Sequence, residues 1–280
     1  MKKVMVVTDS SANMPADLAQ KLNIQVVPIV LALDGRTFRD GVDITAADVY
    51  RWQRESRLLP TTSAPSVGDF LRVYAAAAEE AAAIVSIHLS STLSATFNAA
   101  STASQLIDGV PICVLNCHTA AMGLGFVALE AARAAAGGAD LDAVTSRAQE
   151  VAARVRLLAT LGTLEYLHRG GRIGGAAALV GAMLQIKPVL SLTDGHVDVF
   201  AKPRTQAKAV QVMLQQMNQQ ADGRPLHVAI LHGDLPQEAE GLRQKIAAQS
   251  TCAELYVTEL TPVMGAHTGP GVLGIVFYTD

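Results

Sequence analysis

The sequence has few cysteines, few aromatic residues and little charge, and each shortage excludes a class of protein. The three cysteines, Cys113, Cys117 and Cys252, show no paired spacing suited to zinc, so we expect reduced structural thiols and no metal site. Aromatic residues make up 4% of the 280 residues, and the net charge is −3 with no basic patch. Base stacking and phosphate attraction are therefore unsupported, and we expect no nucleic acid among the partners.

Long hydrophobic runs are also absent. The apolar N-terminal run, residues 4–7, stops at Thr8-Asp9-Ser10, which is too early for the core of a signal peptide. Residues 173–186 are too few and too rich in glycine to span a bilayer. We therefore expect a cytoplasmic protein with no transmembrane segment.

Half of the residues are hydrophobic, enough to bury a large core, and in the first part of the chain apolar runs alternate with helical segments. This alternation indicates an α/β fold with a parallel sheet and helices on both faces. We predict a three-layer α/β/α domain over residues 1–163. Its expected strands are 4–7, 24–33, 83–88, 111–115 and 156–161, and its expected helices are 15–22, 45–55, 66–82, 94–107, 120–136 and 140–154.

From about residue 163 the pattern changes. A glycine-rich loop at 170–175 leads into an apolar segment, and the dipeptide Asp194-Gly195 indicates a hairpin. We predict a second domain over residues 164–280, a two-layer α/β domain with a mixed sheet. Its expected helices are 176–186, 204–219 and 236–249, and its expected strands are 187–192, 196–201, 226–231, 253–259 and 272–278.

Hydroxyl side chains crowd residues 89–96, between an expected strand and an expected helix. The first backbone N–H groups of a helix have no partner within it and point outward with the positive end of the helix dipole, so such a turn is an anion site. Ser94 stands at this point. Its structural alternative is to be only the N-cap of the following helix.

A second hydroxyl cluster lies between two prolines at residues 60–66. Ser66 and Asp69 form the Ser-x-x-Asp pattern that opens a helix. The other hydroxyls have no local structural role, and a ligand shared with Ser94 would explain them: Thr61, Thr62 and Ser63. Because ligands of parallel sheets bind beyond the carboxyl ends of the strands, we expect four residues to gather at one edge: Asp9, Thr62, Ser94 and Asn116.

Two further segments hold candidate site residues. Residues 170–174 offer glycine backbone to a phosphate with Arg172 as its clamp, or else form a structural turn with a solvated arginine. His267 stands among three glycines and a proline at residues 265–271. We predict a rigid loop there, which presents the histidine ring to a cleft.

Ser94, His267 and Asp9 together suggest the triad of a hydrolase. The sequence opposes this, because Thr92 and Thr96 occupy the glycine positions of the Gly-x-Ser-x-Gly turn that exposes such a nucleophile. Hydroxyls that donate hydrogen bonds to a bound anion fit the same residues without that geometry.

Five motifs occur in the order and spacing of the DegV family: residues 8–15, 60–66, 90–96, 170–173 and 265–271. The chain resembles this family over essentially all of its 280 residues. The resemblance implies two domains with a fatty acid buried between them. It also implies similarity to the fatty-acid-binding subunit of bacterial fatty acid kinase, which presents the carboxylate to a separate ATP-dependent kinase subunit and yields acyl phosphate for phospholipid synthesis.

The resemblance also implies roles for individual residues. Thr62 and Ser94 would hydrogen-bond the carboxylate, with Ser63 and Ser91 close by. Two residues would lie at the mouth and steady the acyl phosphate or the docked kinase: Arg172 and His267. No catalytic residue and no cofactor is expected in this chain, since ATP and magnesium belong to the kinase partner.

We therefore predict a lipid-binding carrier with no turnover of its own. Two alternatives stay open: a serine-dependent esterase or acyl transferase with Ser94 as nucleophile and His267 as base, and a phosphate-ligand sensor built on the Arg172 loop. The chain departs from the family pattern at Ala95, where glycine is usual, and at Ala64, where glutamine is common. Ala95 still suits a first helical turn, so we expect any difference at the rim near Ala64.

Overall fold

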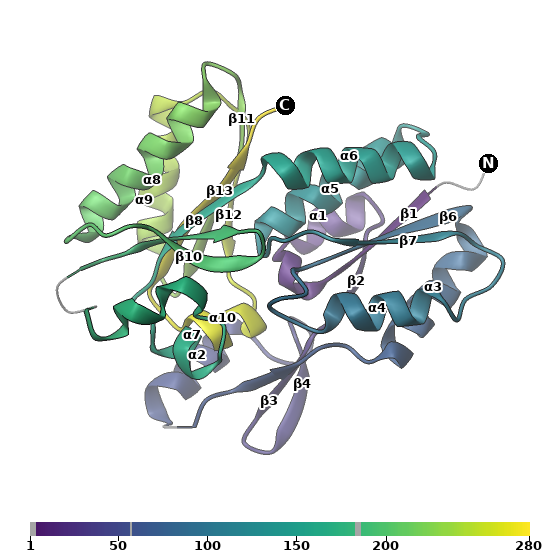
Figure 1. The fold of residues 1–280 in the computed structure, drawn as a ribbon, viewed down its shortest axis with the longest axis horizontal. Helices are drawn as coiled ribbons and strands as arrows, with labels where there is room; N and C mark the ends of the chain where they lie inside the picture. Colours follow the sequence, from purple (N-terminus) through teal and green to yellow (C-terminus); the bar gives the residue numbers. More distant parts are fainter. Residues whose placement is uncertain (1–3, 57, 183–185) are drawn as a thin grey trace.

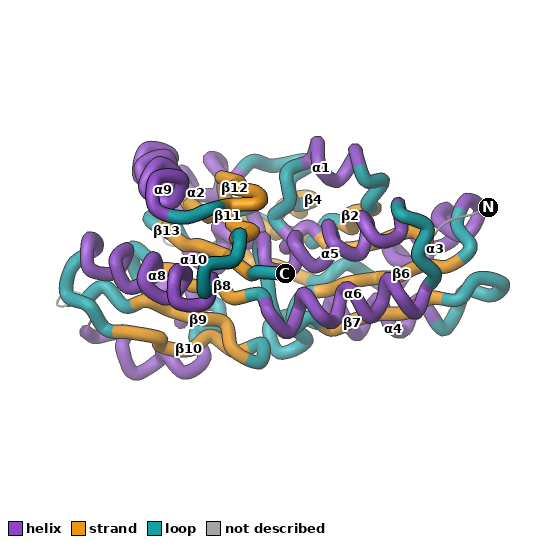
Figure 2. Tube along the Cα trace, turned by 90° about the horizontal axis from the view of Figure 1, so that it is seen from above, coloured by secondary structure: helices purple, strands orange, loops and turns teal. Residues whose placement is uncertain are grey.

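The computed structural model describes residues 4–56, 58–182 and 186–280. The chain forms two halves, each built around a β-sheet, which lie side by side along the long axis of the molecule (Figure 1). Seen from above, the C-terminus ends near the middle of the molecule, where the two halves meet (Figure 2). None of the helices in the described part of the chain has the length and apolar character that crossing a membrane requires.

A four-stranded parallel sheet, in the order β2-β1-β6-β7, lies at the centre of the first half. Side chains of successive β1 residues alternate between two cores, with Val7 facing one and Val6 the other, so residues 4–7 of the strand are all apolar. Helices cover both faces, which confirms the predicted three-layer arrangement. The strands are β1 (Val4–Asp9), β2 (Gln25–Val27), β6 (Ala83–His88) and β7 (Ile112–Asn116); α3 (Val67–Glu80) and α4 (Thr96–Ser104) cover one face, and α5 (Met122–Ala136) and α6 (Leu141–Arg154) the other.

Residues 24–33, predicted as one strand, form two strands in different sheets. Pro28 separates β2 from β3 (Val30–Leu33), since proline has no N–H to donate to a ladder. β3 pairs with β4 (Arg36–Arg39) and β5 (Thr61–Ser63) in a small antiparallel sheet. The hydroxyl cluster at residues 60–66, for which the sequence indicated no strand, therefore contains one, and Thr62 pairs with Leu31.

Short helices complete the first half. Two helices of this half, α2 (Ala46–Glu55) and α3, begin with capping boxes, Thr45 with Asp48 and Ser66 with Asp69. In each box the hydroxyl accepts from the backbone N–H of the acidic residue, and the carboxylate accepts from the N–H of the cap. The remaining elements are η1 (Ser10–Ala12) and α1 (Ala16–Lys21).

A six-stranded mixed sheet, in the order β10-β9-β8-β13-β11-β12, forms the second half. Two helices pack on one of its faces through a separate apolar core, so the predicted mixed-sheet α/β arrangement is confirmed. The strands are β8 (Arg156–Thr160), β9 (Val189–Thr193), β10 (His196–Ala201), β11 (Leu226–Gly233), β12 (Cys252–Glu259) and β13 (Val272–Tyr278), and the helices are α8 (Gln206–Ala221) and α9 (Pro236–Gln249).

Two expectations for the second half were wrong. β8, predicted as the last strand of the first domain, pairs with β13 and β9, so the six-stranded sheet begins before the predicted boundary at residue 163. Where a helix was predicted at 176–186, the 3-10 segment η2 (Gly174–Ala182) follows α7 (Glu165–Arg169). The end of that predicted helix, residues 183–185, lies outside the described residues.

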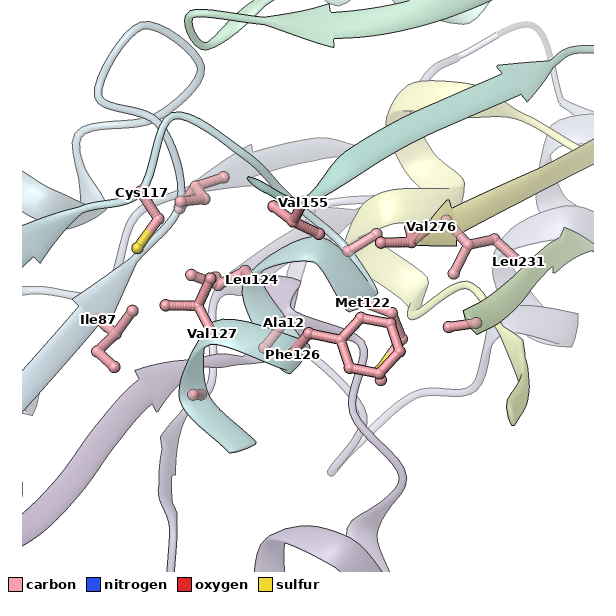
Figure 3. Close-up of a cluster of buried hydrophobic side chains, with 14 of the residues drawn as sticks. Ala12, Ile87, Cys117, Met122, Leu124, Phe126, Val127, Val155, Leu231 and Val276 are labelled. Atoms are coloured by element: carbon pink, nitrogen blue, oxygen red, sulfur yellow. The ribbon is translucent and has the colours of Figure 1, made fainter. Parts of the chain in front are cut away.

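The two halves share one apolar core around α5. Met122 and Phe126 point towards Leu231 and Val276 of the second sheet, whereas Val127 points towards the first sheet (Figure 3). These side chains are almost completely buried. α5 is almost entirely buried and has apolar side chains on both sides, so it joins the two sheets.

Candidate ligand-binding site

A cavity of about 350 Å³ opens between the two halves. Its inner wall is apolar and almost completely buried, and includes Leu89, Leu161, Leu231, Leu260 and Val272. Several polar residues of the wall lie where it reaches the surface. There Ser63 and Ala95 are exposed, and Thr62 and Ser94 are half-buried. The cavity therefore has an apolar interior and a polar mouth, as sites for amphiphilic small molecules do.

Ser94 lies in the segment that leaves β6 and enters α4, residues 89–95, which we call the mouth loop. Its Oγ lies 2.8 Å from Thr96 Oγ1 and accepts from the Thr96 backbone N–H at 3.3 Å. The N-cap of α4 is Ala95, so Ser94 is not the N-cap of this helix, which was the structural alternative for it. The start of α4 faces the cavity at Ala95, and its N–H groups favour an anion there.

Ser91 is not on the cavity wall. The Asn116 side chain holds it on both sides: Nδ2 donates to Ser91 Oγ at 2.8 Å, and Oδ1 accepts from the Ser91 N–H at 3.2 Å. Asn116 thus lies at the predicted edge of the sheet, where it supports the mouth loop. The spacing of the sequence places Ser91 near Ser94, but it does not show which residue forms a hydrogen bond with the Ser91 hydroxyl.

His267 lies on the short helix α10 (Pro262–Thr268), not on the rigid loop that we predicted. Its Nε2 is 2.7 Å from Thr62 Oγ1, and both residues line the cavity. Burial, with the nearby Arg172 charge, lowers the pKa of His267 to about 4. The ring is therefore neutral at neutral pH.

The first half of the chain holds α10 in place. Gln53 Nε2 donates to the Gly265 carbonyl at 3.0 Å, and Asp40 Oδ1 accepts from the Val263 N–H at 2.9 Å. Burial raises the pKa of Asp40. The position of His267 against Thr62 thus depends on side chains far from it in sequence.

Arg172 connects α7 to the mouth loop. Its Nε donates to the Leu93 carbonyl at 3.1 Å, and its Nη1 donates to the Gly170 carbonyl at 2.7 Å. Across the three described ranges of the chain, no carboxylate pairs with this guanidinium. The half-buried Arg172 therefore brings an uncompensated positive charge to the cavity wall.

The hydrolase triad is not assembled. Ser94 Oγ bonds Thr96 and His267 bonds Thr62. Asp9 is completely buried and lies 2.8 Å from His88 Nδ1.

His88 is a residue that the sequence did not single out. Its Nε2 lies 2.7 Å from Ser86 Oγ, which also accepts from Tyr74. Asp9, at the other end of this buried network, accepts from the hydroxyl of Ser11 on the cavity wall. A histidine at the end of a strand that is buried along its whole length was the signal, because a buried ring needs polar partners.

A cavity with an apolar interior and hydrogen-bond donors at its mouth makes this an α/β protein with a site that suits an amphiphilic small molecule. The chain belongs to the DegV family, since a family model described as an uncharacterised protein of the DegV family matches residues 3–280. A DegV domain-containing protein of Streptomyces coelicolor is 37% identical over 277 residues, which cover 98% of each chain.

Solved structures of this family share the fold. A DegV family protein from Thermus thermophilus, described by its fatty acid binding, has a TM-score of 0.95 at 36% identity and covers 99% of this chain and 100% of its own. DegV of Bacillus subtilis, described as a fatty acid binding protein, has a TM-score of 0.92 at 28% identity, with both chains covered to 100%. The two-domain α/β fold implied by the resemblance is thereby confirmed.

Proposed function

We propose that the protein binds a long-chain fatty acid, with the tail in the cavity and the carboxylate at its mouth. The observation that supports this most is the mouth itself, where hydroxyls and the unpaired charge of Arg172 meet an apolar interior. The described fatty acid binding of the Thermus and Bacillus proteins agrees with it.

The apolar interior supplies the affinity. Burying an acyl chain gains on the order of 0.8 kcal/mol per methylene, so a tail of about fifteen would supply roughly 12 kcal/mol before ordering costs. The carboxylate then needs few partners. Hydrogen bonds to it fix the orientation of the ligand more than they fix its affinity.

Thr62 and Ser94 are the proposed donors to the carboxylate, with Ser63 beside them. Neutral His267 supports this role: in the tautomer that carries hydrogen on Nε2, it donates to Thr62 Oγ1 and leaves the threonine hydroxyl hydrogen for the ligand. Arg172 supplies the positive charge of the site.

We further propose that the protein presents the carboxylate to a separate ATP-dependent kinase subunit for acyl phosphate formation, in the cytoplasm and without turnover of its own. Arg172 and His267 would face the transferred phosphoryl group or the docked kinase, which brings ATP and magnesium. The position of the hydroxyls at the open end of the cavity supports this, because the carboxylate would be within reach of a partner.

Mass spectrometry tests the binding proposal. Under native conditions we expect protein purified from cells to carry a mass increment in the fatty-acid range, and after denaturation we expect the increment to disappear. A persistent increment would indicate an acyl-enzyme, which labelling of Ser94 by a fluorophosphonate would verify. Absence of any increment, with no affinity for added fatty acids, would overturn the proposal.

The kinase proposal needs a separate experiment. ATP consumption by a fatty acid kinase subunit is measured with oleic acid and magnesium, with and without this protein. We expect consumption only when the protein is present, and much less with Ser94→Ala. Equal consumption in its absence would contradict the presenting role and leave fatty acid binding intact.

A further inference from the structure

The mouth loop is held from both halves of the molecule. Asn116 anchors it in the first half through Ser91. The second half holds it at the next two residues: Thr92 Oγ1 donates to the Gly195 carbonyl at 2.5 Å, and the Leu93 carbonyl accepts from Arg172. Ser94 follows directly. Its position at the cavity mouth therefore depends on contacts that cross between the halves.

The contact at Gly195 leaves little space. Asp194 and Gly195 form the hairpin turn between β9 and β10, with φ of 48° and 83°. A Cβ added to Gly195 would collide with Ser90 Oγ and lie 3.0 Å from Ser90 Cβ, and Ser90 is completely buried. Ser90 Oγ in turn lies 2.9 Å from Thr92 Oγ1. The turn thus fits against the loop only with glycine at this position.

We propose that Thr92 and Gly195 form a clasp that holds the mouth loop over the ligand and sets the rate at which a bound fatty acid leaves. They act as positioning residues for Ser94. This inference rests on the proposed function for the identity of the ligand. Because the cavity wall comes from both halves, a ligand with a buried tail leaves when the halves separate at the mouth, and the clasp opposes that separation.

Release of parinaric acid, a fluorescent fatty acid, tests the clasp by stopped flow against excess oleic acid. The added methyl group of Gly195→Ala collides with Ser90, and we expect about tenfold faster release. Thr92→Val keeps the shape but removes the donor, and release should be roughly threefold faster. Thr92→Ser keeps the donor and should restore the wild-type rate.

Gly35→Ala is the matched control. Asp34 and Gly35 form the turn between β3 and β4 with φ of 50° and 71°, and a Cβ at Gly35 would have no atom within 4 Å. The Gly35→Ala variant introduces the same kind of backbone strain at a turn that does not contact the mouth loop, so we expect it to release the probe at the wild-type rate.

Three results would overturn the clasp. If Gly195→Ala and Thr92→Val bound the probe and released it at the wild-type rate, the clasp would be wrong while fatty acid binding stood. If Gly35→Ala accelerated release as much as Gly195→Ala, turn strain would be the cause. If the wild-type protein retained no probe at all, the proposed function would fail together with the clasp.

Discussion

At the scale of single residues, the sequence motifs indicated most residues of the cavity mouth but not the hydrogen-bond partners that hold them in place. Thr62, Ser94, Arg172 and His267 line one cavity, although they come from four separate segments. Hydroxyl residues with no capping role indicated a ligand site, because capping roles can be recognised from spacings of a few residues in the sequence. Ser91 does not line the cavity, and its partner Asn116, 25 residues away, could not be read from the motif.

The Thr62 hydroxyl gives a prediction at this scale. We expect Thr62→Val to weaken fatty acid binding roughly tenfold or more, because a hydrogen bond to a charged group contributes about 1.5–3 kcal/mol. Binding is measured by titration with parinaric acid. Thr61→Val is the control, since Thr61 is exposed on the same strand and does not line the cavity. Equal loss in both variants would contradict a specific role for Thr62.

At the scale of elements, local patterns predicted helices better than sheet membership. Capping boxes are complete within four residues, so Thr45 and Ser66 could be read directly. Which sheet β8 joins depends on its pairing with β13, more than 100 residues later, and its own residues do not encode that choice. His267 lies on a helix because Pro262 begins it and side chains of the first half hold it.

The capping box of α3 offers a test that separates stability from binding. Ser66→Ala removes the acceptor for the Asp69 N–H and should lower the free energy of unfolding by about 1 kcal/mol. Because Ser66 is not on the cavity wall, affinity for fatty acid should stay unchanged. Urea unfolding and probe titration measure the two effects. A matching loss of affinity in Ser66→Ala would mean that helix capping and fatty acid binding cannot be separated in this segment.

At the scale of the whole molecule, a network of charges joins the two halves away from the cavity. Arg133 of α5 donates to Glu254 of β12 at 2.7 Å, and Arg147 of α6 donates to Asp280 at 2.7 Å. His227 of β11 lies between these carboxylates, with Nδ1 2.7 Å from Glu254 and Nε2 3.1 Å from Asp280. Both ring nitrogens can donate only when the imidazole is protonated, so the geometry favours the cation.

The charge of His227 therefore makes stability depend on pH. Burial alone would lower the pKa of His227, but its hydrogen bonds to Glu254 and Asp280 outweigh burial and raise it. A raised pKa in the folded state means that the contribution is fully present below the unfolded value near 6.5 and is lost as pH rises through the folded value. We expect urea unfolding between pH 5.5 and 9 to show a decline on the order of 1 kcal/mol above pH 6.5. His227→Gln should abolish this decline, whereas His196→Gln, at an exposed position, should keep it. A decline that persists in His227→Gln would assign the pH dependence to another group.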